Sequence, residues 1–183
     1  MGLTLAQPPE GGLSAVGRAL DHLGSPFENG AGEALRPIPL YGVGETALNA
    51  ANPLKAALRF GWRYIVRDSL GAATIDITDE ERPQLLRMSR GDKPKRLLRA
   101  AARAEAASGA EEQEVRILAF DQLSEEILWL TAPKGDRFIP LAGGRSLGAS
   151  ALLRRERARV RRRAPSDTAP MPAVGFEPDT SVS

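Results

Sequence analysis

Arginine is concentrated near the C-terminal end of this sequence. Residues 154–163 read RRERARVRRR, with a single acid, Glu156, among seven arginines: Arg154, Arg155, Arg157, Arg159, Arg161, Arg162 and Arg163. A guanidinium group presents paired N–H donors that match the oxygens of phosphates and carboxylates. So dense a block of positive charge indicates either an anionic partner or complete solvation.

Three interpretations of this run stay open: contact with nucleic acid, contact with another anionic macromolecule such as an acidic protein or a membrane surface, and a solvated tail without a partner. We favour nucleic acid. No aromatic residue stands among the arginines, so the expected contact is with the phosphate backbone, without sequence specificity. On a helical wheel the arginines point in nearly all directions, and Leu153 and Val160 form only a thin apolar stripe. We therefore expect an arm outside the core.

A second basic group, Arg96, Arg99 and Arg103, is spaced by three and four positions and so lies on one side of a predicted helix. This group is either a secondary basic face or the partner of acids that follow it. We favour internal pairing, because residues 82–103 hold eight basic groups and one acid, whereas residues 104–126 hold seven acids and one basic group. The acids considered for this pairing are Glu111, Glu112, Glu114, Glu125 and Glu126.

Acidic residues offer one candidate metal site. Asp76, Asp79, Glu80 and Glu81 are close in sequence, and carboxylate oxygens bind divalent cations. The competing interpretation, which we favour, is that these acids stand at the positive N-terminus of a helix that begins near residue 79. The sequence has no cysteine and one histidine, which excludes thiolate nucleophiles, disulfides and multi-histidine zinc sites. We expect no cofactor and no metal.

The net charge of +2 conceals four blocks of different charge. Residues 1–54 carry −3, residues 55–142 carry +1, residues 143–163 carry +7 and residues 164–183 carry −3. No apolar run reaches the ~20 residues of a membrane span, and the first residues lack the basic and apolar regions of a secretory leader. We expect a cytoplasmic protein without a membrane span.

The length of 183 residues and a hydrophobic content of 42% suit one domain with additional segments at both ends. We place this domain at residues 45–142. A mobile N-terminal arm is expected over residues 1–44, and a basic, then acidic and proline-containing, tail over residues 143–183.

The N-terminal arm contains a predicted amphipathic helix at residues 13–23. A helix this short needs a surface to pack on, either its own domain or a partner. The apolar residues that would dock it on a protein partner are Leu13, Val16, Leu20 and Leu23. Residues 24–44 contain Pro37 and Pro39 and are expected to form an irregular linker.

The fold class predicted for residues 45–142 is α+β, a small and mostly antiparallel sheet of about five strands with helices on one face. The predicted element order is β-β-α-α-β-β-β, with the first two strands forming an antiparallel hairpin. A helical stretch from Glu45, restarting at Pro53, precedes them. The expected strands lie at 62–67, 73–78, 115–120, 127–130 and 137–141, and the expected helices at 79–91 and 92–108.

These features favour a non-enzymatic accessory or assembly protein whose arginine-rich segment binds nucleic-acid backbone or another anionic macromolecule. We also expect the N-terminal arm to contact a protein partner. The second hypothesis is a structural subunit of a large assembly, such as a phage particle or a multi-subunit complex, whose arms gain order on neighbours. The third is an enzyme that works with carboxylates and a divalent metal.

Overall fold

The computed structural model describes residues 3–4, 6–22, 34–68, 71–107, 112–120 and 123–163. The strands are β1 (Leu3–Thr4), β2 (Ala34–Val43), β3 (Leu58–Asp68), β4 (Gly71–Thr78), β5 (Leu85–Arg90), β6 (Gln113–Phe120), β7 (Leu123–Thr131), β8 (Arg137–Pro140) and β9 (Leu147–Gly148). The helices are α1 (Gly12–His22), α2 (Glu45–Leu48), the 3-10 helix η2 (Pro53–Ala56), α3 (Asp92–Ala107) and α4 (Ala149–Arg163).

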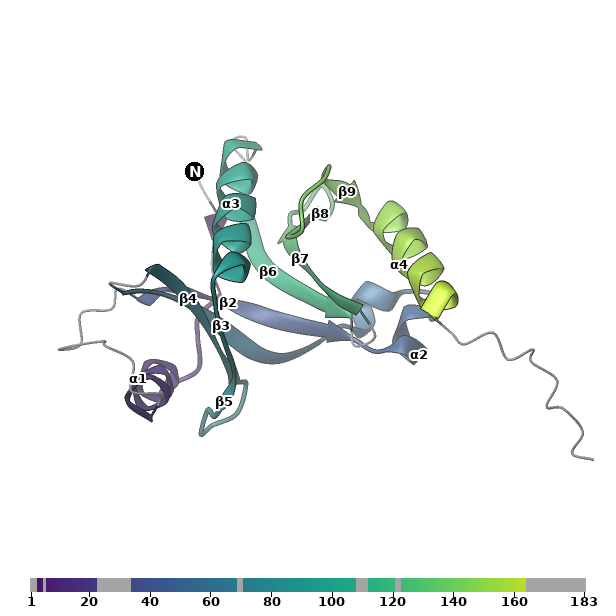
Figure 1. The fold of residues 1–183 in the computed structure, drawn as a ribbon. Coiled ribbons are helices and arrows are strands. Elements are labelled where there is room, and N and C mark those ends of the chain that lie inside the picture. The colour runs from purple at the N-terminus through teal and green to yellow at the C-terminus, as the bar shows by residue number, and fades with distance from the viewer. Residues whose placement is uncertain are drawn as a thin grey trace, which may run out of the picture.

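The fold is α+β, and one mixed sheet forms its centre (Figure 1). Among the described residues, eight strands follow the order β5-β4-β3-β2-β6-β7-β8-β9, and the short strand β1 pairs with β6 beside this path. Neighbours on the path are antiparallel except β2 and β6, which run parallel. The prediction of about five strands in the order β-β-α-α-β-β-β is therefore wrong in the size of the sheet and in its order.

Several predicted elements are confirmed. Strands 62–67 and 73–78 lie within β3 and β4, which pair as an antiparallel hairpin. The three later predicted strands correspond to β6, β7 and β8, and helix 92–108 corresponds to α3. The helical stretch from Glu45 is α2, and Pro53 opens η2 at its first position, where the missing N–H costs nothing.

Strand β2 corrects the prediction of an irregular linker at residues 24–44, of which residues 34–43 form this strand. Proline has no N–H to donate to a sheet, so the pair Pro37 and Pro39 argued against a strand. The structure accommodates them in two ways. The register with β3 shifts between Leu35 and Ile38, around Pro37, and the parallel pairing with β6 begins only at Leu40. Both prolines thus precede the part of β2 that is paired on both sides.

Strand β5 corrects the predicted helix at 79–91. Residues 79–84 form bends and an irregular segment around Pro83, and residues 85–90 then pair with β4. Here pairing between distant strands overrides local helix preference. Gly91, at φ 79°, consequently connects a strand to α3 instead of ending a helix.

Helices α1 and α3 cover opposite faces of the sheet. On β3, Trp62 and Tyr64 belong to the core cluster that contains Val16 and Leu20 of α1. Ile65 belongs instead to the cluster under α3. Successive side chains of a strand point to opposite faces, so the two helices lie on different sides, as Figure 1 shows.

Helix α1 packs on its own chain, one of the two alternatives expected for residues 13–23. Val16 and Leu20 are buried, whereas Leu13 is 64% exposed. Leu23 lies outside the described residues. Two of the four residues proposed for docking a partner are thus covered by β3 and β4. None of the described helices is both long and apolar enough to cross a membrane.

Candidate nucleic-acid interface

The arginine run lies in α4, and this helix is packed against the sheet. Arginine, alanine and leucine are strong helix formers, and no glycine or proline interrupts residues 149–163. Leu152 is fully buried in a cluster with Ile127 and Trp129 of β7, and Leu153 and Val160 pack at its edge. The segment expected as an arm outside the core therefore contributes to the core. Leu128, which lies between Ile127 and Trp129 on β7, belongs instead to the cluster under α3. Since successive side chains of a strand point to opposite faces, α3 and α4 cover opposite faces of β7.

Arg157 ties α4 to the loop that follows α2. Its Nε donates to the carbonyl oxygen of Leu48 at 2.9 Å, and its Nη2 donates to that of Ala50 at 3.1 Å. Carbonyls at the end of a helix have no intrahelical donor, so a guanidinium group is a suitable partner for them. Arg157 is thus occupied in holding the fold.

Arg155 and Arg159 are paired with carboxylates. Arg155 donates from Nε to Glu156 at 2.6 Å and from Nη2 to Glu125 of β7 at 3.3 Å. Arg159 binds the same two carboxylates. The side chain of Glu156 is fully buried, and a buried carboxylate needs such partners. The single acid of the run thus pairs with two arginines of its own helix, and Glu125 links the same two arginines to β7.

The remaining arginines of α4 face away from the sheet. Arg154, Arg161 and Arg162 are exposed, and none of them forms a hydrogen bond or ion pair with another described residue. Arg163 is exposed at the end of the helix. Arg154 and Arg161 are seven residues apart, two helical turns or about 10 Å along the axis. The structure thus divides the seven predicted residues into an anchoring set and an outward-facing set.

The second basic group does not pair with Glu114, Glu125 or Glu126, three of the acids considered above. Arg103 donates to the carbonyl oxygens of Gly144 and Pro140, and Arg99 donates to that of Lys95. Arg96 lies 4.0 Å from Asp92 on its own helix. These three acids bind arginines on other elements: Glu114 pairs with Arg116, Glu125 with Arg155 and Arg159, and Glu126 with Arg63 and Arg87. Glu111 lies outside the described residues.

Four charged residues from four strands form a partly buried cluster that the sequence analysis missed: Arg63 of β3, Asp76 of β4, Arg87 of β5 and Glu126 of β7. Burial by itself raises the pKa of Glu126, but hydrogen bonds and charges from Arg63 and Arg87 outweigh it and lower that pKa to about 2. Burial opposes the charge of Arg63 as well, yet Asp76 and Glu126 raise its pKa above the ordinary value. Arg63 and Glu126 are therefore ionised near neutral pH.

The acids proposed as a metal site are separated by this arrangement. Asp76 accepts hydrogen bonds from Arg63 and Arg87, and Asp79 accepts from the Nε of Arg59 and the Nε1 of Trp62, each at 2.7 Å. Glu80 and Glu81 are exposed on the bend after β4. Residues 79–84 begin no helix, so the favoured explanation of these acids is wrong too. Across the described residues, no three acidic or histidine side chains are grouped as metal ligands.

No family model, curated protein or solved structure matches this chain. The proposed function therefore rests on the charge and geometry of the chain itself.

Proposed function

We propose that this protein is a non-enzymatic binder of nucleic-acid backbone, and that the outer side of α4 makes the contact. The observation that carries the proposal is the outward-facing set, Arg154, Arg161 and Arg162. The helix that presents them is fixed to the rest of the fold by Leu152, Arg157 and the carboxylate of Glu125. A fixed array of guanidinium groups loses less conformational entropy on binding than a flexible tail does.

The chemistry of this surface suits phosphates more than bases. Guanidinium groups bind phosphate oxygens through paired donors. No aromatic residue occurs in α4, so bases have no ring to stack on. Three phosphate contacts give weak binding that is independent of sequence and falls with salt, in the range of about 10⁻⁴ to 10⁻⁶ M typical of non-specific complexes.

Fluorescence anisotropy with a labelled DNA duplex of mixed sequence tests the proposal. The test variant is Arg154→Ala/Arg161→Ala/Arg162→Ala. Its matched control, Arg18→Ala/Arg67→Ala/Arg82→Ala, removes the same charge from exposed positions on α1, β3 and the bend after β4. We expect the test variant to bind about tenfold more weakly at low salt, and the control to change by about twofold or less. Equal losses in the two variants, or no loss in either, contradict the proposal.

A structural subunit of a larger assembly is the second candidate. Large apolar side chains are exposed where β3 begins, with Leu58 at 75% and Phe60 at 44%. Exposed apolar residues in neighbouring positions are a feature of surfaces that contact other proteins. Sedimentation of the wild type and of Leu58→Ser/Phe60→Ser separates the two candidates. An oligomer that dissociates in the variant supports the assembly role, and a monomer in both contradicts it.

A further inference from the structure

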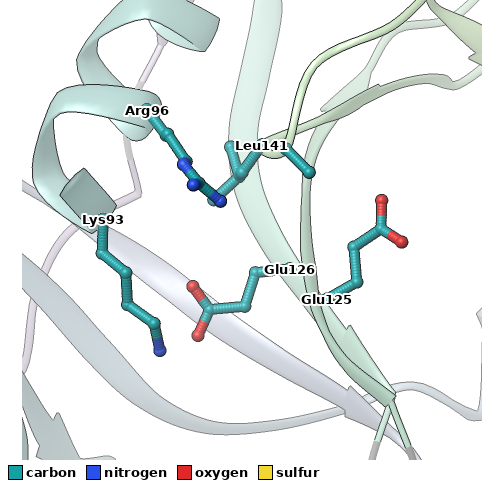
Figure 2. A pocket seen from close by; sticks show the side chains of 6 residues that line it. Lys93, Arg96, Glu125, Glu126 and Leu141 are labelled. Carbon is teal, nitrogen blue, oxygen red and sulfur yellow. The ribbon is translucent and has the colours of Figure 1, made fainter.

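A basic groove runs along α3. Two adjoining cavities, of about 230 Å³ and about 450 Å³, share Arg96, Leu141 and Ala142 and so form one groove. The α3 side is lined by four basic residues, Lys93, Arg96, Arg99 and Arg103, and the opposite side by the loop after β8, at residues 141–143. We call this feature the α3 groove. Figure 2 shows Lys93 and Arg96 projecting from α3 at its first part, with Leu141 nearby.

The acids in the α3 groove do not cancel its positive charge. Glu125 and Glu126 line the end near Lys93, and their carboxylates point in different directions in Figure 2. Glu126 is neutralised by Arg63 and Arg87, and Glu125 by Arg155 and Arg159, all from elements other than α3. The cations on α3 are thus left without strong partners from these acids.

Arg103 and two glycines give the α3 groove a fixed second wall. Arg103 donates to the carbonyl oxygens of Pro140 and Gly144, which ties the loop to α3. Gly143 and Gly144 have φ values of 108° and 107°, a conformation that side chains disfavour. The loop is therefore shaped in advance of any ligand, which reduces the entropy lost on binding.

We propose that the α3 groove binds the phosphate backbone of single-stranded nucleic acid. Residues 93 to 103 place four cations along about 15 Å of helix, which suits a chain of repeated negative charges rather than one small anion. The cavity volumes are far below that of a duplex of the same length, so a single strand is the form that the α3 groove can enclose. The lining residues include no aromatic side chain, so the contact is with phosphates and without base preference. This inference rests on the proposed function, since it names a second surface for the same class of partner.

Two single-cysteine variants of the full chain report on the two surfaces separately. The sequence contains no cysteine, so Ala102→Cys in the α3 groove and Ala158→Cys on the outer side of α4 each accept one environment-sensitive dye. Both alanines are exposed, and circular dichroism checks that the labelled proteins are folded. The probes are a short oligothymidylate, inorganic tripolyphosphate and a polyglutamate peptide.

The proposal predicts that oligothymidylate changes the dye signal at position 102 and does so at a lower concentration than either other probe. Arg96→Ala/Arg99→Ala weakens that response by about fivefold to tenfold, whereas the matched pair Arg18→Ala/Arg67→Ala changes it by about twofold or less. A silent dye at 102, no effect of Arg96→Ala/Arg99→Ala, or tighter binding of polyglutamate overturns the proposal for the groove. If only the dye at position 158 responds, the proposed function of α4 holds and the proposal for the α3 groove fails. If only the dye at position 102 responds, the proposal for the α3 groove holds and the role of α4 is wrong.

Discussion

Arg63 and Asp76 lie opposite each other in the β3–β4 hairpin and are joined by two hydrogen bonds of 2.7 Å. Their side chains are 3% and 4% exposed. The pair faces the α3 side of the sheet, where Glu126 and Arg87 complete it. Buried charges are expensive unless each is paired, so this cluster fixes how β3, β4, β5 and β7 are arranged.

Removing one partner from this cluster should destabilise the fold. Asp76→Asn leaves Arg63 with Glu126 alone, and we expect the free energy of unfolding to fall by about 2–4 kcal/mol. Urea denaturation measures the change. Glu80→Gln is the control, since this exposed acid forms one contact of 3.4 Å with Thr78, and its effect should stay within about 0.5 kcal/mol. Equal losses in the two variants would show that the buried pair stabilises the fold no more than an exposed acid does.

The lowered pKa of Glu126 makes stability depend on pH. The value is about 2 in the folded state against an ordinary 4.5, so the unfolded chain binds the proton more readily. The resulting stabilisation is complete above about pH 4.5 and is lost as pH falls toward 2, with a size of about 3 kcal/mol. Glu126→Gln should remove this part of the pH dependence in denaturation curves measured between pH 2 and 6. An unchanged pH profile would refute the assignment.

The hydroxyl of Tyr64 is packed against Gly12 at the start of α1. A Cβ at residue 12 would overlap the Tyr64 hydroxyl, which is buried without a hydrogen-bond partner among the described residues. Gly12→Ala should therefore destabilise the protein by about 1–3 kcal/mol. Tyr64→Phe should be neutral or stabilising, because it removes an unsatisfied polar group, and should reduce the cost of Gly12→Ala. A double-mutant cycle in thermal denaturation measures this coupling, and strictly additive effects would exclude the contact.

Glu125 limits how many arginines α4 offers to a partner. Glu125→Gln removes a carboxylate shared by Arg155 and Arg159. We expect DNA affinity to rise about twofold to threefold, because these guanidinium groups become more available. Glu80→Gln removes the same charge from a distant position and controls for net charge. If both variants bind DNA equally well, the ion pairs at Glu125 do not restrict binding.

Part of the buried cluster could be predicted from the sequence. The strands at 62–67 and 73–78 were predicted by alternation and expected to form a hairpin, and the observed register, in which Asp68 pairs with Gly71, places Arg63 opposite Asp76. The positions of Arg87 and Glu126 in the cluster could not be predicted, because β5 and β7 are placed by strand pairings that depend on the whole sheet. Strand β5 was itself mistaken for a helix.

The two largest errors concern residues whose local preference is overridden by tertiary contacts. Pro37 and Pro39 argued against β2, which lies at the centre of the sheet. In α4, the thin apolar stripe of Leu153 and Val160 did not reveal the buried side of the helix, which includes Glu156. With Leu152 it forms that side, and its charge is balanced by Arg155 and Arg159. A helical wheel predicts which residues share a side of a helix, but it does not predict that a carboxylate on that side is buried.

The salt dependence of DNA binding tests the role of α4 most directly. Each phosphate contact adds about 0.9 to the slope of the logarithm of the binding constant against the logarithm of salt concentration. Relative to the wild type, Arg154→Ala/Arg161→Ala/Arg162→Ala should therefore lower that slope by about 2 to 3, whereas Arg18→Ala/Arg67→Ala/Arg82→Ala should leave it unchanged within error. The same slope in the wild type and the α4 variant would contradict the assignment of nucleic-acid binding to this helix.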